Sequence, residues 1–223
     1  MKAMILAAGR GERLKPLTDT TPKALIEVKG QPLIVHHIHN LKLCGINDIV
    51  INIAYLGSQI EQCLGSGSEF GVKITYSREV DGGLETGGGI VNALPLLGLE
   101  EPFITLNADV YCDYPLATLK TKLSALAHLV LVNNPVHNPN GDFAIENQLL
   151  SNGHENKPYT FAGIAIYHPQ FFEGLEVSRY SIAPIIREKA KLKMISAECY
   201  DGMWFDIGTL TRLQTARQAL EQT

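Results

Sequence analysis

The feature that most constrains the fold is the alternation of short apolar runs with helix-like patterns in the first part of the chain. The apolar runs are rich in β-branched residues and bounded by turn residues, as buried strands are. They lie at residues 3–7, 48–53, 72–76, 103–106 and 128–132. Helical periodicity lies between them at residues 33–44, 59–64 and 116–126. This alternation predicts an α/β fold, a three-layer Rossmann-like arrangement with a mixed, mostly parallel sheet covered by helices on both faces.

The chain changes character after residue 133, where turns rich in Asn, Pro and Gly separate short strands. These turns predict a small antiparallel, substrate-binding elaboration within residues 134–165, with strands near 142–145 and 149. Regular elements then return, as a strand at 159–167, a helix at 182–190, a short strand at 203–207 and a closing helix at 210–220. Because no linker or low-complexity tract interrupts the pattern, we expect one domain over residues 1–223.

The charge balance restricts the partners. The chain has 19 Lys and Arg against 23 Asp and Glu, a formal net charge of −4, so neither nucleic acid nor an anionic membrane is an expected partner. The four cysteines form no C-x-x-C pair, and the apolar start is too short for a signal peptide, which predicts a cytoplasmic location. A site for a negatively charged ligand must therefore be built locally.

Such a site is predicted at the end of the first apolar run, which leads into G-R-G-E-R at residues 9–13. Gly9 and Gly11 allow backbone N–H groups to approach phosphate oxygens closely. Arg13 and Lys23 add positive charge, which a tight turn alone would not require. The alternative, a turn with no ligand, would explain the two glycines but not these cations.

Two other phosphate-binding patterns fit this segment less well. A dinucleotide fingerprint would need a glycine at Leu14 and an unbroken helix after it, but Pro16 and Pro22 would interrupt that helix. The P-loop pattern is missing from the sequence. The segment is therefore expected to bind phosphate in a loop of another type.

Two aspartates are candidates for a metal site. Asp109 follows the apolar run 103–106, at the end of a predicted strand, where open α/β sheets bind ligands. Asp206 lies in the apolar run W-F-D-I-G-T, where an unpaired carboxylate would be costly. Mg²⁺ is commonly held by one or two carboxylates together with substrate phosphates. The alternative for each aspartate is a turn or helix cap.

The run L-E-T-G-G-G-I at residues 84–90 is too rich in glycine for an ordinary helix start. It is interpreted as a segment whose backbone closely approaches a base or ribose, with a flexible loop as the alternative.

Taken together, these motifs resemble those of the sugar-1-phosphate nucleotidyltransferases. Residues 6–18, L-A-A-G-R-G-E-R-L-K-P-L-T, followed by Pro22-Lys23, are similar to the family's opening motif, and N-A-D at 107–109 and W-F-D-I-G-T at 204–209 are similar to its two metal motifs. Glu12 stands where many members have Thr, so no hydroxyl contact is expected there. The resemblance implies a fold of the nucleotide-diphospho-sugar transferase type and an enzyme.

The resemblance also implies roles for individual residues. Arg13, near the leaving pyrophosphate, Lys23, near the transferring phosphate, and Asp109 are the implied catalytic residues, and Asp109 and Asp206 the implied Mg²⁺ ligands. The implied nucleotide-binding residues are Leu6, Ala7, Ala8, Gly9, Arg10, Gly11, Glu12, Arg13, Lys23, Glu85, Thr86, Gly87, Gly88 and Asn107. The implied sugar-side residues are Asn107, Gly141, Asp142 and Gly163.

Within the family, the resemblance is greatest to a branch of short uridylyltransferases, carried by the run 84–90, G-D-F at 141–143 and H-L-V-L-V-N-N-P at 128–135. It implies transfer of UMP from UTP to a sugar 1-phosphate, N-acetylmuramic acid α-1-phosphate, in peptidoglycan recycling. Transfer to mannose or glucose 1-phosphate with another nucleotide, or a non-catalytic nucleotide-sugar sensor, are the alternatives. The group that would bind the acceptor's carboxylate is left open among Lys157, Arg179 and Arg187.

Overall fold

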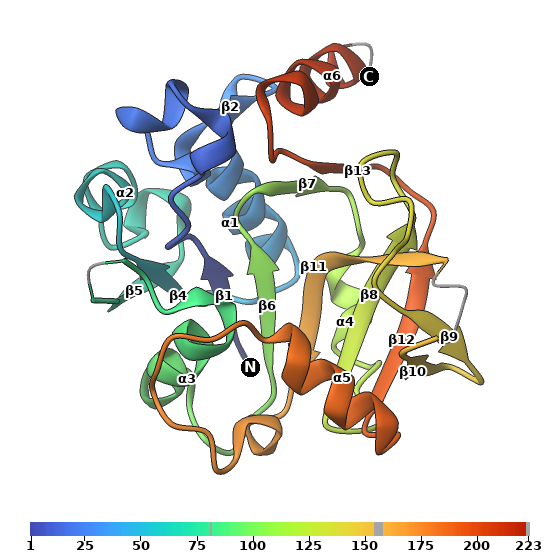
Figure 1. The fold of residues 1–223 in the computed structure, drawn as a ribbon. Helices are drawn as coiled ribbons and strands as arrows, with labels where there is room; N and C mark the ends of the chain where they lie inside the picture. The colour runs from blue at the N-terminus through green and yellow to red at the C-terminus, as the bar shows by residue number, and fades with distance from the viewer. Residues whose placement is uncertain (81, 154–157, 222–223) are drawn as a thin grey trace.

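The computed structural model describes residues 1–80, 82–153 and 158–221, and its centre is a nine-stranded sheet (Figure 1). The strand order is β5-β4-β1-β6-β11-β8-β12-β10-β9. The strands are β1 Lys2–Leu6, β4 Asp48–Ile53, β5 Lys73–Arg78, β6 Phe103–Asn107, β8 Ala127–Asn133, β9 Ala144–Glu146, β10 Leu149–Ser151, β11 Tyr159–Tyr167 and β12 Ile195–Tyr200. Among these described strands, β10 and β11 run against the direction of the others. The predicted mixed, mostly parallel sheet is confirmed.

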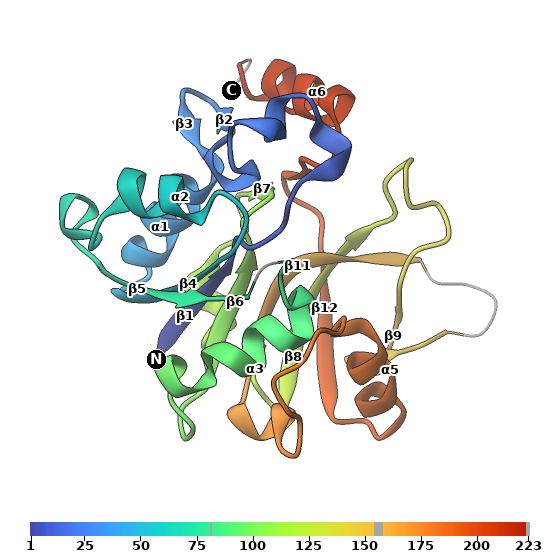
Figure 2. The same cartoon turned by 60° about the vertical axis from the view of Figure 1, so that its left-hand side comes forward.

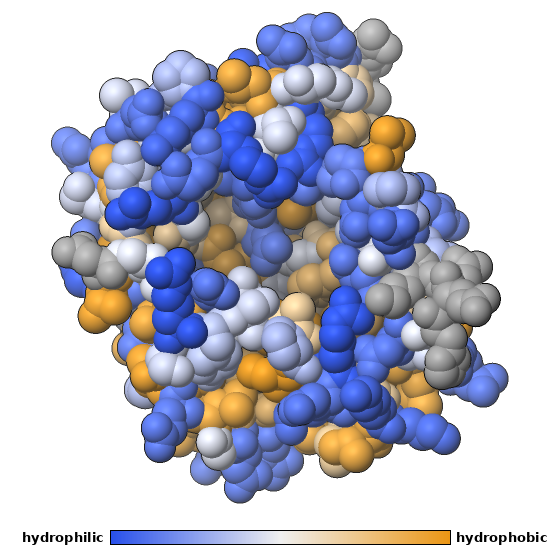
Figure 3. Space-filling view, viewed as in Figure 1, coloured by the Kyte–Doolittle hydropathy of each residue, from blue (hydrophilic) through white to orange (hydrophobic). Residues whose placement is uncertain are grey.

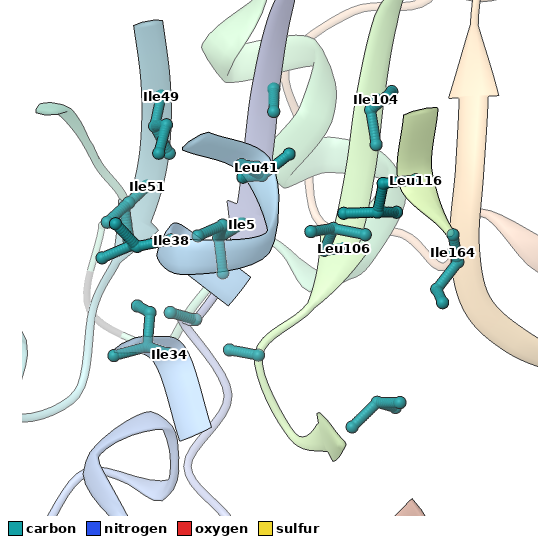
Figure 4. Close-up of a cluster of buried hydrophobic side chains, with 14 of the residues drawn as sticks. Ile5, Ile34, Ile38, Leu41, Ile49, Ile51, Ile104, Leu106, Leu116 and Ile164 are labelled. Carbon is teal, nitrogen blue, oxygen red and sulfur yellow. The ribbon is translucent and has the colours of Figure 1, made fainter. Parts of the chain in front are cut away.

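Helices cover both faces of this sheet, as predicted. Helices α1 Leu33–Leu43, α2 Gly57–Leu64 and α4 Leu116–Leu119 contribute to the apolar core on one face, and Figure 4 shows Ile34, Ile38 and Leu41 of α1 beside Ile5 of β1. Helices α3 Glu85–Leu97 and α5 Ala183–Lys191 contribute to the core on the other face (Figure 2). Side chains of successive strand residues point to opposite faces of the sheet. A strand whose residues are all apolar therefore contributes to the apolar cores on both faces.

Smaller elements close the fold beside the carboxyl end of β1. Strand β7 Val110–Cys112 pairs antiparallel with β13 Trp204–Asp206, and β2 Glu27–Val28 pairs with β3 Gln31–Pro32. Three short 3₁₀ turns follow β1, at Glu12–Leu14, Leu17–Asp19 and Lys23–Leu25. Helix α6 Leu210–Leu220 packs its buried leucines into a third apolar cluster with this region. Helix α6 therefore lies beside the segment around β2 that follows the first strand (Figure 1).

The predicted antiparallel elaboration is a hairpin of β9 and β10 at one edge of the main sheet. Its turn is Asn147-Gln148, and both residues have positive φ values, 52° and 65°. Two-residue hairpin loops favour such left-handed backbones because their twist matches that of the strands. Within the described residues, no helix has the length and apolar character needed to cross a membrane.

Helix α4 and strand β12 are among the elements that differ from the predictions. The helix predicted at 116–126 ends at Leu119, because the hydroxyls of Thr118 and Thr121 bond to nearby carbonyls and compete with helix formation. Strand β12 was not predicted. Its Ser196 and Glu198 both lie against His128 of β8, so the strand lacks the apolar pattern that marks its neighbours.

The strand order places a crevice at the carboxyl end of β1. The chain passes from β1 through α1 to β4 on one side, and later returns to β6 on the other side. Connections that leave in opposite directions open a crevice between them, where α/β sheets bind ligands. The ends of β1, β4 and β6 are therefore expected to border a binding site.

Candidate functional site

A pocket of about 390 Å³ lies in the crevice at the carboxyl end of β1, and this volume is typical of small-molecule sites. Figure 3 shows a hollow on this face, with mostly hydrophilic residues around it. The pocket is lined by Leu6, Ala7, Ala8, Gly9, Arg10, Gly11, Glu12, Lys23, Ala24, Asn52, Glu79, Gly82, Gly83, Glu85, Thr86, Asn107, Ala108, Asp109 and Arg179. The structure thus brings together most of the residues predicted to bind the nucleotide.

The loop after β1 forms one wall of the pocket. Gly11 has φ 67°, and a Cβ atom there would lie 2.9 Å from Cγ2 of Thr18, whose hydroxyl donates to the Gly11 carbonyl at 2.9 Å. The backbone can therefore curl back only with a glycine at this position. Among the described residues, no atom lies within 4 Å of a Cβ atom built at Gly9, so this part of the loop is open to a ligand. Arg13 is exposed and does not line the pocket.

Lys23 and Asp109 meet inside the pocket. Lys23 begins the third 3₁₀ turn, Asp109 lies in the turn between β6 and β7, and the ammonium donates to Oδ2 of the carboxylate. The side chains are 13% and 32% exposed. In this half-buried place the two opposite charges compensate each other. The structure therefore places Lys23 beside Asp109, the first of the two predicted metal ligands.

Asp206 lies on the strand next to Asp109. Residues of β13 pair with β7, and the Ile207 N–H donates to the Asp109 carbonyl at 2.9 Å. The Asp206 side chain itself is outside the pocket lining, and its Oδ2 accepts from Nη1 of Arg212 at 2.8 Å. Nε2 of His137 lies 3.3 Å from the same oxygen. The backbones that carry the two predicted metal ligands are thus adjacent.

The donor set around these aspartates fits a magnesium ion shared with substrate. In the described parts of the chain, no three His, Cys, Asp or Glu side chains form a group that could hold a metal by themselves. Asp109 and Asp206 each use Oδ2 in their ion pairs, and Oδ1 of each has no hydrogen-bond partner among the described residues. Two carboxylates that leave the other positions to phosphates and water are what Mg²⁺ commonly uses.

A neutral histidine lies beneath the turn that carries Asp109. Burial, and to a smaller extent the neighbouring His36, lowers the pKa of His37 to about 4, although the carbonyls of Asn107 and Val110 and the Asp109 carboxylate act in the opposite direction. His37 is therefore uncharged at neutral pH. Its place in the core beneath this turn makes it part of the support of the site.

Among the lining residues that the sequence analysis missed are two polar ones, Asn52 and Glu79. Asn52 of β4 accepts from the Ala7 N–H at 2.8 Å and donates to Glu79 at 2.6 Å, and Glu79 also accepts from the Leu84 N–H at 2.6 Å. This chain of bonds joins the ends of β1 and β4 to the segment before α3. The available signal was Asn52 itself, because a polar residue inside an apolar strand must find partners when buried.

The glycine run 84–90 is the start of α3, contrary to the expectation of a non-helical segment. A Cβ atom at Gly88 would lie 1.8 Å from the Ser178 carbonyl oxygen. The N–H groups of Gly87 and Gly88 donate to the Tyr180 carbonyl at 3.0 and 3.3 Å, and the Tyr180 N–H donates to Leu84 at 3.1 Å. The glycines therefore let the segment 178–180 lie directly on the first turn of the helix.

Because of this packing, only some of the residues that were predicted to bind the nucleotide in this run reach the pocket. Glu85 and Thr86 line the pocket, whereas Gly87 and Gly88 are buried against segment 178–180 and do not. The segment brings Arg179 to the pocket, where its Nε lies 3.5 Å from Oε1 of Glu85. Gly87 and Gly88 thus position an arginine of the pocket, while direct nucleotide binding by them remains a prediction.

Gly88→Ala is expected to destabilise the protein by about 1–3 kcal/mol, because the added methyl group overlaps the Ser178 carbonyl and overpacking has costs of that size. Urea unfolding would measure the loss. Gly9→Ala is the control, since its methyl group meets nothing within 4 Å, and its unfolding midpoint should stay near that of the wild type. Equal stability of Gly88→Ala and wild type would contradict the packing role.

Of the residues predicted on the sugar side, Asn107 lines the pocket, whereas Gly141, Asp142 and Gly163 lie outside its lining. Both carboxylate oxygens of Asp142 are engaged, by the Phe161 N–H at 2.9 Å and by Asn138 Nδ2 at 3.2 Å. Gly141 precedes it with φ 61°. These contacts tie the loop after β8 to β11, and sugar binding by Gly141 and Asp142 remains a prediction.

Gly163 supports a pocket residue. It has φ 76°, and a Cβ atom there would lie 2.7 Å from Nδ2 of Asn107, which lines the pocket. The glycine lets β11 pass beside Asn107 at the irregularity between Phe161 and Ile164.

Of the three cations left open for the acceptor's carboxylate, Arg179 lines the pocket. Arg187 donates to the Asp142 carbonyl at 3.2 Å and stacks on Phe143, and Lys157 lies outside the described residues.

Comparison with known sequences gives relatives along the whole chain. The sequence model of the family described as Nucleotidyl transferase matches residues 2–223. The chain is 48% identical to the N-acetylmuramate alpha-1-phosphate uridylyltransferase of Neisseria meningitidis serogroup B, over 97% of both chains. It is 34% identical to a mannose-1-phosphate guanyltransferase of Aspergillus oryzae over 93% of its own length, and it spans 61% of that relative.

Comparison with solved structures gives the same fold. A Bacillus anthracis structure described as a glucose-1-phosphate thymidylyltransferase in complex with a sucrose matches with a TM-score of 0.87 and 26% identity, over 100% of this chain and 96% of that one. HddC from Yersinia pseudotuberculosis complexed with GMP-PN matches with a TM-score of 0.78 and 21% identity, over 98% and 99% of the two chains, a likeness of fold alone. The family match along almost the whole chain and the 48% identical relative confirm the resemblance seen in the motifs: this chain belongs to the nucleotidyl transferase family.

Proposed function

We propose that this protein transfers UMP from UTP to N-acetylmuramic acid α-1-phosphate and releases pyrophosphate. The observation that carries the proposal is the 48% identity, over 97% of both chains, to the Neisseria uridylyltransferase of that sugar phosphate. The pocket geometry supports it, because Lys23 and Asp109 meet at the carboxyl end of β6 beside the open loop at Gly9. The reaction would serve peptidoglycan recycling in the cytoplasm.

In the proposed reaction, an oxygen of the sugar 1-phosphate attacks the α-phosphorus of UTP in line. The new phosphorus–oxygen bond forms as the bond to the bridging β-phosphate oxygen breaks, and pyrophosphate leaves with the electron pair. A phosphomonoester has a second pKa of about 6, so the attacking oxygen is already ionised at neutral pH. The residues therefore need to bring two polyanions together rather than to remove a proton.

The cations that line the pocket and the loop after β1 would bring the two polyanions together. Lys23 would neutralise the phosphate that is transferred, and the backbone around Gly9 would receive the triphosphate. Arg10 and Arg179, which line the same pocket, would add charge at its rim. Arg179 is our candidate for the acceptor's carboxylate, because of the three cations left open it is the one that lines the pocket, where its exposed guanidinium lies 3.5 Å from Glu85.

Asp109 and Asp206 would hold the divalent ion. Bound Mg²⁺ supplies charge neutralisation for phosphate oxygens. The supporting observation is that both carboxylates have one oxygen free of hydrogen-bond partners among the described residues. Asp109, which already lines the pocket, would be the carboxylate nearer to the phosphates.

A substrate panel tests the proposal. Pyrophosphate release would be measured with UTP, GTP, dTTP and ATP, each paired with the 1-phosphates of N-acetylmuramic acid, mannose and glucose, with Mg²⁺ present. UTP with N-acetylmuramic acid α-1-phosphate is expected to have the highest kcat/KM. A preference for GTP and mannose 1-phosphate, the activity named for the 34% identical relative, would overturn the specificity. No release with any pair would favour a non-catalytic sensor.

A further inference from the structure

Two side chains from different elements hold the carboxylate of Asp206 by the same oxygen. Arg212, in the first turn of α6, donates from Nη1 to Oδ2 at 2.8 Å, and His137, in the loop between β8 and β9, has Nε2 at 3.3 Å from Oδ2. The other oxygen, Oδ1, has no hydrogen-bond partner among the described residues. The carboxylate is thus held asymmetrically.

The path of the arginine explains the glycine in W-F-D-I-G-T. A Cβ atom at Gly208 would lie 1.9 Å from Nη2 of Arg212 and 2.9 Å from Oδ1 of Asp206. The guanidinium therefore crosses the backbone at Gly208, a position that a larger residue would fill. The Arg212 N–H donates to the Thr209 hydroxyl at 3.3 Å, which caps α6 and directs the arginine back towards β13.

Docking of α6 does not account for this arrangement. The helix packs through Leu213, Ala216 and Leu220 in the third apolar cluster, and Arg217 donates twice to the Glu27 carbonyl, at 3.0 and 2.8 Å. Arg212 is only 16% exposed, and its Nε is buried without a hydrogen-bond partner in the described part of the chain. A buried guanidinium with an unpaired N–H lowers stability, so the docking of α6 gives no reason for its presence.

We propose that Arg212 is a positioning residue for the divalent-ion site, which fixes Asp206 through Oδ2 and keeps Oδ1 available to the metal. The inference rests on the proposed function for the identity of the site. Carboxylates that ligate metals are commonly oriented by hydrogen bonds to their second oxygen, and loss of such partners lowers metal affinity about 10–100-fold. His137 adds a second, more exposed contact, which links the loop on the sugar side to the same carboxylate.

Binding of Mn²⁺ alone tests the proposal, with the free ion measured by electron paramagnetic resonance in titrations of the whole protein. Arg212→Ala is expected to raise the dissociation constant for Mn²⁺ about tenfold, as happens when other residues that hydrogen-bond to metal ligands are removed. Arg212→Lys retains a charge and a donor, so it should bind Mn²⁺ more tightly than Arg212→Ala but less tightly than wild type. Arg217→Ala is the matched control on the same helix, and it should bind Mn²⁺ as wild type does.

The following results of the Mn²⁺ titrations would overturn the proposal. Unchanged or tighter Mn²⁺ binding by Arg212→Ala would overturn the proposal, because the arginine would then be neutral to the metal or compete with it. An equal loss in Arg217→Ala would overturn it by assigning the effect to α6 docking. If circular dichroism shows that Arg212→Ala is unfolded, Arg212→Lys decides in its place, and wild-type affinity in that variant overturns the proposal.

The proposed function fails separately from this inference. Wild-type protein that binds Mn²⁺ with the expected variant series, yet releases no pyrophosphate from any substrate pair, would refute the function and leave the role of Arg212 standing. Wild-type protein that releases pyrophosphate from UTP, while all variants bind Mn²⁺ equally, would refute the role of Arg212 alone. Absence of Mn²⁺ binding by the wild type would refute the role as well.

Discussion

Lys23→Ala is expected to lower kcat for pyrophosphate release by about 10²–10³-fold, the usual effect of removing one preorganised group that stabilises charge in the transition state. The ammonium lies in the pocket beside Asp109 and is only 13% exposed, so water would replace it poorly. The measurement is steady-state release from UTP and the sugar 1-phosphate, with circular dichroism to establish that the variant is folded.

Lys42→Ala provides the matched control. Lys42 is exposed on α1 and does not line the pocket. Its loss should therefore leave kcat within about twofold of wild type, as expected for a surface substitution away from the site. A folded Lys23→Ala variant with near-normal kcat would remove the proposed role of this lysine. A change confined to KM would instead indicate that it binds substrate and transition state equally.

Asp109→Asn is expected to lower kcat by about 10³-fold at fixed Mg²⁺, a loss comparable to that of a transition-state charge stabiliser. The amide keeps the shape of the side chain but removes its negative charge, so it leaves Lys23 without its ion pair and weakens cation binding. Activity should be followed across a Mg²⁺ titration, where the variant is expected to need more of the ion for its remaining activity.

Asp113→Asn is the control for that substitution. Asp113 follows β7 directly, is exposed, and accepts from the Tyr200 hydroxyl outside the pocket. It should retain wild-type activity and the same Mg²⁺ dependence. An Asp109→Asn variant with a wild-type Mg²⁺ titration would show that this carboxylate does not hold the metal, whatever its effect on kcat.

The local motifs could be predicted from the sequence because their chemistry is continuous in the chain. The open loop at Gly9 and Gly11 follows β1 directly, and Asp109 follows β6 directly, so a predicted strand already places each of them at the sheet's edge. Lys23 required only the nearby 3₁₀ turns to reach the same pocket. Side-chain roles at these positions still depend on the proposed activity.

The relationships that the sequence did not reveal are contacts between distant segments. Asn52 and Glu79 line the pocket because β4 and β5 end at the same edge of the sheet as β1. The run at Gly88 is read correctly only when the Ser178 carbonyl is known to lie against it. Strand β12 was missed because its buried polar residues find partners on β8.

By itself, the sequence determined the α/β class, and it placed the glycine loop and Asp109 at the ends of strands, because apolar periodicity and glycine-rich turns act over a few neighbouring residues. Only the tertiary structure decided which carboxylates stand together and which cations hold them. The pairing of Asp206 with Arg212 depends on β13 lying against β7 and on α6 turning back over Gly208. Such pairings arise from sheet order and helix docking, which bring distant parts of the chain together after the local elements have formed.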